Sequence, residues 1–155
     1  LIVCYHKILT IYSILAVDDK LEIYRTIIME SNFEGLTVMV IDDSKTMRRT
    51  AETLLKKAGC EVITAVDGFD ALAKIVDNNP DIIFVDIMMP RLDGYQTCAL
   101  IKNSQNYQNI PVIMLSSKDG LFDQAKGRVV GSDEYLTKPF SKDELLNAIR
   151  NHVTA

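Results

Sequence analysis

The stretch IIFVDIMMPRLDG, residues 82–94, constrains the fold more than any other part of the chain. Its first four residues are apolar, an acid follows at Asp86, and Pro90 and Gly94 then favour a loop. A continuous apolar run that ends at turn residues is typical of a strand buried on both faces, as in a parallel sheet. Asp86 would then lie at the carboxyl end of this strand, where open α/β sheets bind their ligands. Taken alone, the acid is better explained as a cap of the turn that follows.

Strands and helices alternate from Gly35 onward. Apolar runs bounded by turn residues predict strands at residues 37–41, 62–65, 82–85, 112–115 and 134–136. Helical spacing of apolar residues predicts a helix after each strand, and the fourth of these, over 121–130, is the weakest. The predicted core-facing residues are Met47, Ala51, Leu54, Leu55 and Ala58 in the first helix; Phe69, Leu72, Ile75 and Val76 in the second; Tyr95, Cys98 and Ile101 in the third; and Leu145, Leu146, Ile149 and Val153 in the last. Five strands alternating with five helices predict a doubly wound α/β domain, with a parallel sheet covered on both faces.

The ends of these helices carry matching signals. Ser44 can cap the first helix, and Gly59 is a natural stop after it. Ser141 and Glu144 have the spacing of a capping box at the start of the last helix. Local sequence and apolar pattern therefore agree on where the helices begin and end.

Composition argues against several classes of protein. The chain has 155 residues, 48% hydrophobic and 25% charged, as in a globular protein with one full core. Its net charge of −4 argues against nonspecific nucleic-acid binding, which requires a basic surface. Three cysteines without C-x-x-C spacing, Cys4, Cys60 and Cys98, indicate a reducing compartment and no zinc site. His6 and His152 stand near the chain ends with no nucleophile beside them, so no histidine-based triad is expected.

Residues 1–34 differ from the rest and are predicted to form an N-terminal extension, with the main domain at 35–155. The apolar run at 8–17 is too short for a membrane-spanning helix, which takes about 20 residues, and no clean signal-peptide cleavage site follows it. The motif ILAVDD at 14–19 resembles VMVIDD at 38–43, as the broken start of a duplicated unit would. Met29 is an alternative start, which would make 1–28 an upstream extension.

Polar residues follow the carboxyl ends of four predicted strands: Asp42 and Asp43, Asp86, Ser116, and Lys138. These ends lie on one edge of a parallel sheet, so the side chains should meet there. Three carboxylates in one pocket repel one another unless a cation lies between them, and Mg²⁺ suits such oxygen ligands. A lysine and a hydroxyl beside them can bind phosphoryl oxygens, which leaves Asp86 as a nucleophile that forms an acyl phosphate. Each residue alone has an ordinary structural explanation, but the complete set is improbable by chance.

The same residues fall within four recognisable segments: VIDDS at 40–44, FVDIMMPRLDG at 84–94, MLSS at 114–117 and YLTKPF at 135–140. Together these segments resemble the receiver domains of two-component response regulators, of the single-domain CheY-like kind. The resemblance extends from Gly35 to Val153. It implies a flavodoxin-like sheet of five parallel strands in the order 2-1-3-4-5.

The resemblance assigns a role to each acid of the pocket. Asp86 would be the phosphoacceptor and would also bind Mg²⁺. Asp43 would bind the ion directly, Asp42 would reach it through a water molecule, and the backbone carbonyl of Met88 would complete the protein ligands. Mg²⁺ is therefore the expected cofactor.

The resemblance also implies a group of residues that respond to the phosphoryl group. Lys138 and Ser116 would bind phosphoryl oxygens. Tyr135 would act as the switch, moving inward when the hydroxyl moves toward the phosphate and changing the surface of the fourth helix, fifth strand and fifth helix. The Lys138–Pro139 peptide bond is expected to be cis. Because no further domain follows Ala155, the output is expected to be protein contact.

A narrower resemblance concerns the pathway. DGFDALAKI at 67–75, PRLDGYQTCALIK at 90–102 and SSKDGLFDQAKGR at 116–128 are similar to the single-receiver regulators of type IV pilus twitching motility. This implies a histidine kinase of the chemotaxis type as donor and a downstream motility protein as receiver of the signal. The protein would be cytoplasmic, with no nucleic acid as partner and no membrane insertion.

Two other functions stay open at this point. An aspartyl-phosphate phosphatase or phosphotransferase would use the same nucleophile, but the haloacid dehalogenase type expects an acid two residues later, where this chain has Met88. A phosphorylation-independent interaction module would require that the N-terminal segment block the acidic pocket. A nucleotide-binding site is not expected, because neither G-x-G-x-x-G nor G-x-x-x-x-G-K-[ST] occurs.

Overall fold

The computed structural model describes residues 19–22, 33–117 and 121–153, without the side chains of residues 121 and 122. The chain divides into two compact units, Leu1–Phe33 and Glu34–Ala155. In the first unit, residues 19–22 form a helical turn. The first five residues of the motif at 14–19 and the alternative start at Met29 lie outside the described residues. The assignment of residues 1–34 as an extension stays a prediction. In the part of the chain that the structure describes, no helix is both long and apolar enough to cross a lipid bilayer.

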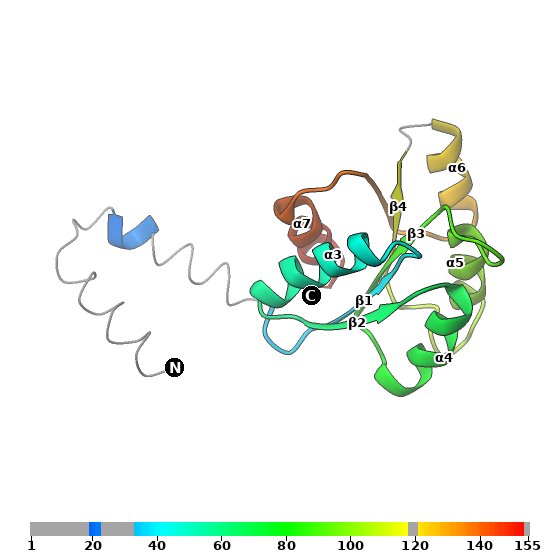
Figure 1. Ribbon diagram of the computed structural model, residues 1–155, viewed down its shortest axis with the longest axis horizontal. Coiled ribbons are helices and arrows are strands. Elements are labelled where there is room, and N and C mark those ends of the chain that lie inside the picture. The colour runs from blue at the N-terminus through cyan, green and yellow to red at the C-terminus, as the bar shows by residue number, and fades with distance from the viewer. Residues whose placement is uncertain (1–18, 23–32, 118–120, 154–155) are drawn as a thin grey trace. The chain divides into compact units, whose positions relative to one another are not determined.

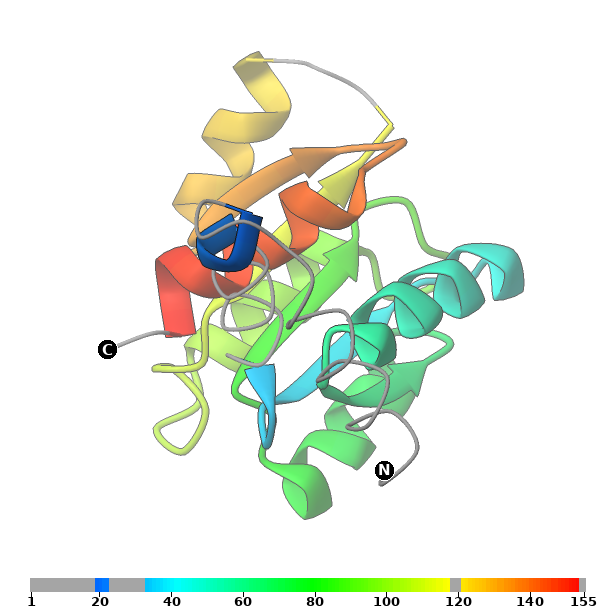
Figure 2. The same cartoon turned by 90° about the vertical axis from the view of Figure 1, so that its left-hand side faces the viewer.

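The second unit is built on a parallel sheet, whose strands lie between the helices of this unit (Figures 1 and 2). Its described strands are β1 (Thr37–Ile41), β2 (Glu61–Ala65), β3 (Ile82–Asp86), β4 (Val112–Ser116) and β5 (Glu134–Thr137). They pair in the order β2-β1-β3-β4-β5, and every pair is parallel. The predicted sheet and strand order are confirmed. All residues of β3 and β4 are buried, which explains why both read as unbroken apolar runs.

Helices connect the strands and cover both faces of the sheet. They are α3 (Lys45–Lys57), α4 (Gly68–Asn78), α5 (Gly94–Lys102), α6 (Leu121–Val129) and α7 (Lys142–Val153). Helices α3 and α7 pack together on one face, and α4 and α5 pack together on the other (Figure 1). This arrangement leaves the carboxyl ends of the strands uncovered, and the loops that carry the predicted site lie there.

The predicted helix signals are seen in the structure. Ser44 accepts a hydrogen bond from the amide of Met47 at the start of α3, and Gly59 adopts a φ of +98° after that helix ends. At the start of α7, the Ser141 amide donates to Glu144 Oε2 at 2.7 Å and the Glu144 amide donates to Ser141 Oγ at 3.2 Å. Both bonds of a capping box are therefore present.

The core between the sheet and helices α4 and α5 contains apolar residues from both layers. The sheet contributes Met39, Ile41, Ile83, Val85 and Met114, and the helices contribute Ala71, Ile75, Cys98 and Ile101. Cys60 and Cys98 are buried free thiols, and burial raises the pKa of each to about 11. Neither thiol is therefore activated as a nucleophile.

The predicted buried face of α4 is partly wrong. Phe69 and Val76 are 55% and 58% exposed, whereas Ala71 and Ile75 are buried. The reason lies at the helix start, where a Cβ on Gly68 would come within 2.3 Å of Thr97 Oγ1. Because the helix approaches α5 so closely, the face that carries Gly68 and Ala71 lies against the core, and residues about 100° further round the helix point outward.

Candidate functional site

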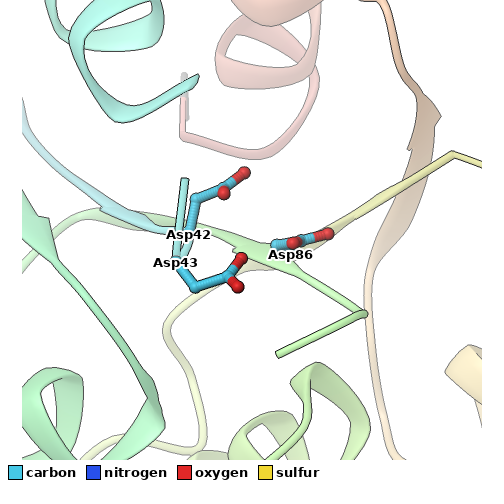
Figure 3. A group of neighbouring side chains, drawn as sticks. All are labelled: Asp42, Asp43 and Asp86. Atoms are coloured by element: carbon cyan, nitrogen blue, oxygen red, sulfur yellow. The ribbon is translucent and has the colours of Figure 1, made fainter. Parts of the chain in front are cut away.

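Three carboxylates gather where β1 and β3 end. Asp42 and Asp43 directly follow β1, and Asp86 is the last residue of β3 (Figure 3). These strands are neighbours, with Ile41 opposite Val85, so the acids leave the sheet side by side. One oxygen from each carboxylate lies within 4.8 Å of the others. Residues far apart in the chain therefore form one acidic pocket.

A glycine lets the next segment pass close to Asp86. A Cβ on Gly94 would come within 2.3 Å of the Asp86 carbonyl oxygen. The Gly94 amide donates to the Ile87 carbonyl at 3.0 Å, which closes the loop between β3 and α5. Gly94 thus holds the start of α5 directly against the acid-bearing strand end.

Lys138 enters this pocket from the end of β5. Its Nζ donates to Asp42 Oδ2 at 2.6 Å and lies 3.1 Å from Asp86 Oδ1. The backbone continues the pairing of β5 with β4, because the Lys138 amide donates to the Ser116 carbonyl at 2.6 Å. The following peptide bond, Lys138–Pro139, is cis. One ammonium therefore bridges two buried carboxylates.

The pocket shifts the pKa values of Asp86 and Lys138, whose side chains contact each other. Burial, helped by the negative charge of Asp42, raises the pKa of Asp86 above its ordinary value, although the Lys138 ammonium acts in the opposite direction. For Lys138, burial alone would lower the pKa, but the hydrogen bond to Asp42 and the charges of Asp86 and Asp42 outweigh it and raise the pKa. Lys138 stays protonated as the counter-ion of the acids.

The three acids differ in what their oxygens already bind. Asp42 is 1% exposed; its Oδ1 accepts the Ser44 amide at 2.8 Å and its Oδ2 accepts Lys138. Asp86 is 6% exposed and accepts a weak bond from the Met88 amide at 3.4 Å. Asp43 is exposed, and its carboxylate makes no hydrogen bond with any residue that the structure describes. Asp43 is thus the acid best able to take a new ligand.

The donor set fits a magnesium ion. Mg²⁺ binds oxygen at about 2.0–2.1 Å, so oxygens on opposite sides of the ion lie about 4.2 Å apart. One oxygen from each of the three carboxylates lies within 4.8 Å of the others, so a small ion among them is within reach of more than one carboxylate. Hard oxygen ligands with a net negative charge favour this ion over softer metals.

The predicted phosphoryl-binding and switch residues lie on the neighbouring strands. Ser116 is the last residue of β4 and is buried. Tyr135 lies in β5, is half-buried, and lines a cavity of about 240 Å³ together with Gln124, Arg128, Ser132 and Glu134. Met88 follows Asp86 in the loop, and its side chain is 68% exposed.

Two contacts around the pocket were missed from the sequence. Arg48 of α3 donates from Nη1 to the carbonyl oxygens of Asp42 and Asp43. The position of Arg48, just over one helical turn after Ser44, was the available signal, since a long side chain there can reach back to the preceding loop. Arg91 pairs with Asp67 and lies over the ring of Phe69, 5.6 Å from its centroid, which fastens the β3–α5 loop to α4. No sequence spacing indicated this second contact.

Comparison with known proteins gives a consistent result for this part of the chain. The family model described as response regulator receiver domain matches residues 38–150. Over 125 residues the chain is 78% identical to Protein PilG of Pseudomonas aeruginosa, a match that covers 81% of this chain and 93% of that protein. The matched range 38–150 contains every residue of the acidic pocket and Lys138.

Solved structures share the fold. Chemotaxis protein CheY4 of Vibrio cholerae superposes with a TM-score of 0.73 at 32% identity, covering 76% of this chain and 98% of that one. The receiver domain of Francisella response regulator 1452 gives a TM-score of 0.71 at 39% identity, with 77% and 97% covered. Sequence and structure comparisons therefore converge on the same kind of domain.

Proposed function

The chain belongs to the response regulator receiver family of two-component systems, and from this premise we propose that Asp86 accepts a phosphoryl group from a histidine kinase. The observation that carries the proposal is the bridge of Lys138 between Asp42 and Asp86. These are two of the three carboxylates that each have an oxygen within 4.8 Å of the others. A buried acid with a paired lysine at the exit of a central strand is arranged for nucleophilic attack on a phosphoryl donor.

The transfer uses a carboxylate oxygen of Asp86 as the attacking atom. A P–O bond forms between this oxygen and phosphorus, the P–N bond of the donor phosphohistidine breaks, and its electron pair stays on the imidazole nitrogen. Lys138 opposes the effect of burial on the pKa of Asp86 and so favours the ionised nucleophile. Attack by water on the acyl phosphate later releases inorganic phosphate and restores the carboxylate.

The chain's own acids hold the metal in this proposal. Asp43, Asp86 and the Met88 carbonyl are the direct ligands, and Asp42 acts through water because Lys138 and the Ser44 amide already occupy its oxygens. When bound, Mg²⁺ supplies positive charge to the phosphoryl oxygens. Lys138 then pairs with the phosphoryl group, and Ser116 donates its hydroxyl to one of the phosphoryl oxygens.

Signalling follows from the charge that the phosphoryl group adds, about −1.5 to −2. Lys138 and Ser116 are drawn toward that charge, and Tyr135 changes its position. Since Tyr135 lines a cavity with residues of α6 and β5, its movement changes the shape of that surface. The response is a population shift between two packings of one fold, and a partner protein binds one packing better than the other.

Two similarities support a role in type IV pilus twitching motility. The chain is 78% identical to PilG over 125 residues, and its segments 67–75, 90–102 and 116–128 resemble those of pilus regulators. The phosphoryl donor is then a chemotaxis-type histidine kinase and the receiver of the signal a motility protein. A cytoplasmic location is part of the same proposal. We expect no turnover on external phosphomonoesters, because Met88 stands where a haloacid dehalogenase phosphatase has its second acid.

Intact-mass spectrometry tests the proposal. Incubation with acetyl phosphate and Mg²⁺ should add one phosphoryl group to the wild type, and omission of Mg²⁺ should prevent it. Asp86→Asn should stay unmodified. The matched control is Asp77→Asn, an exposed acid on α4, which should be modified like the wild type. A wild type that takes no phosphoryl group, or an Asp86→Asn variant that does, contradicts the proposal.

A further inference from the structure

The side chain of Arg48 folds back onto the loop that carries two of the acids. Its Nη1 donates to the Asp42 carbonyl oxygen at 2.7 Å and to the Asp43 carbonyl oxygen at 3.1 Å. Arg48 lies in the first turns of α3 and is half-buried. One cationic nitrogen therefore binds two consecutive backbone carbonyls and neither carboxylate.

These two carbonyls belong to the peptide planes on either side of the Asp43 Cα atom. Each peptide unit is planar, so the backbone at Asp43 has only two soft torsions, φ and ψ. Holding both flanking planes fixes both torsions, and with them the direction of the Cα–Cβ bond. Hydrogen bonds from a charged donor are stronger than those between neutral groups, which makes Arg48 an effective clamp.

Among the described residues only the backbone orients Asp43, and Arg48 shares this role with the Ser44 amide, which belongs to the peptide plane after Asp43 and donates to Asp42 Oδ1 at 2.8 Å. The Asp43 carboxylate is exposed and makes no hydrogen bond with any described residue, whereas Asp42 is held by Lys138 and the Ser44 amide. The backbone is thus the one described connection through which the protein directs this carboxylate toward Asp86.

We infer that Arg48 is a positioning residue for the metal site: it clamps the backbone at Asp43 so that this carboxylate faces the ion. The inference rests on the proposed function, since it assumes a divalent ion between Asp43 and Asp86. Partners that orient metal ligands without touching the metal typically change affinity 10- to 100-fold when they are lost. Arg48 acts through the backbone, so we expect the lower end of that range, about tenfold.

The electrostatic effect of the guanidinium has the opposite sign. A positive charge near the pocket repels Mg²⁺, so its removal alone would strengthen binding. Loss of the clamp weakens binding. The direction of the change in affinity therefore separates a positioning role from a purely electrostatic one.

The experiment uses Arg48→Met, which keeps the aliphatic stem and good helix propensity but has no donor. Arg49→Met is the matched control: Arg49 is the next residue of α3, carries the same charge, is exposed, and makes no bond to these carbonyls. The Mg²⁺ affinity of each full-length protein is measured from backbone amide shifts during a MgCl₂ titration, without a phosphoryl donor. Urea unfolding of the same samples reports any general loss of stability, which alone leaves the affinity of the folded protein unchanged.

We expect Arg48→Met to bind Mg²⁺ about tenfold more weakly than the wild type and Arg49→Met to bind within about twofold of it. Arg48→Lys, which keeps the charge and a donor, should recover part of the loss. An Arg48→Met affinity equal to or tighter than that of Arg49→Met overturns the positioning role and leaves the proposed function standing. A wild type whose amides at Asp43 and Asp86 do not respond to Mg²⁺ overturns both.

Discussion

Replacing Lys138 by methionine should destabilise the metal-free protein by about 3 kcal/mol at neutral pH. The ammonium lies 2.6 Å from Asp42 Oδ2 and 3.1 Å from Asp86 Oδ1, and the side chains of these residues are 15%, 1% and 9% exposed. At an effective dielectric constant of about 20, each contact is worth about 5–6 kcal/mol before the cost of desolvation. Breaking a buried pair costs about 3–5 kcal/mol net, and the lower end applies because Asp42 keeps the Ser44 amide.

The effect of pH on this variant has a definite sign. Burial already raises the pKa of Asp86 above 3.8 in the folded state, and loss of Lys138 removes the charge and hydrogen bond that most oppose this rise, leaving only the bond from the Met88 amide. A carboxyl group with a raised folded pKa opposes folding while it is ionised, and this cost disappears as the pH falls through the folded pKa toward 3.8. The stability difference between variant and wild type should therefore shrink between about pH 7 and about pH 4.

Urea unfolding followed by far-ultraviolet circular dichroism, with a chelator present, measures both effects. Lys74→Met is the control, because Lys74 also pairs with an acid, Asp70, at 2.9 Å, but its side chain is 41% exposed. An exposed pair of this kind is worth no more than about 1 kcal/mol. The reasoning is refuted if Lys138→Met costs no more than Lys74→Met, or if its cost grows as the solution is acidified.

Three further predictions concern the neighbouring elements. Gly94→Ala should destabilise the protein by about 1–3 kcal/mol and disturb the Asp86 amide resonance, because the new Cβ meets the Asp86 carbonyl; an unshifted resonance with wild-type stability would contradict this. Tyr95→Phe should cost about 0.5–1.5 kcal/mol, because the Tyr95 hydroxyl donates to Asp123 at 3.2 Å between α5 and α6; equal urea midpoints would count against it. Burial, followed by the contact with Asp123, raises the pKa of Tyr95 from 10.0 to about 12, so one tyrosine should titrate above the ordinary range in an ultraviolet pH titration.

The sheet and the acidic pocket were predictable from the sequence for a physical reason. Strands buried on both faces appear as unbroken apolar runs, and in a parallel sheet their carboxyl ends share one edge. Asp42 and Asp86 come at the ends of such runs, and Lys138 follows the shorter, half-buried strand β5, so their meeting follows from strand positions alone, without knowledge of side-chain conformation. The structure brings these three residues into direct contact.

The details that depend on contact between helices and loops were not predictable. Periodicity alone placed Phe69 and Val76 in the core, but the close approach of Gly68 to Thr97 turns them outward. The position of Arg48 after Ser44 allows its side chain to reach the preceding loop, but the sequence does not show that its guanidinium contacts two backbone carbonyls. Such contacts depend on rotamers and loop paths, which a spacing rule does not specify.

The site of phosphorylation is the most direct test of the central claim. Borohydride reduces an acyl phosphate to the alcohol, so the modified aspartate becomes homoserine and can be located by tandem mass spectrometry of the digested protein. After treatment with acetyl phosphate and Mg²⁺, we predict homoserine at position 86 and at no other aspartate. Homoserine at Asp42 or Asp43, or no homoserine at all, would contradict the account.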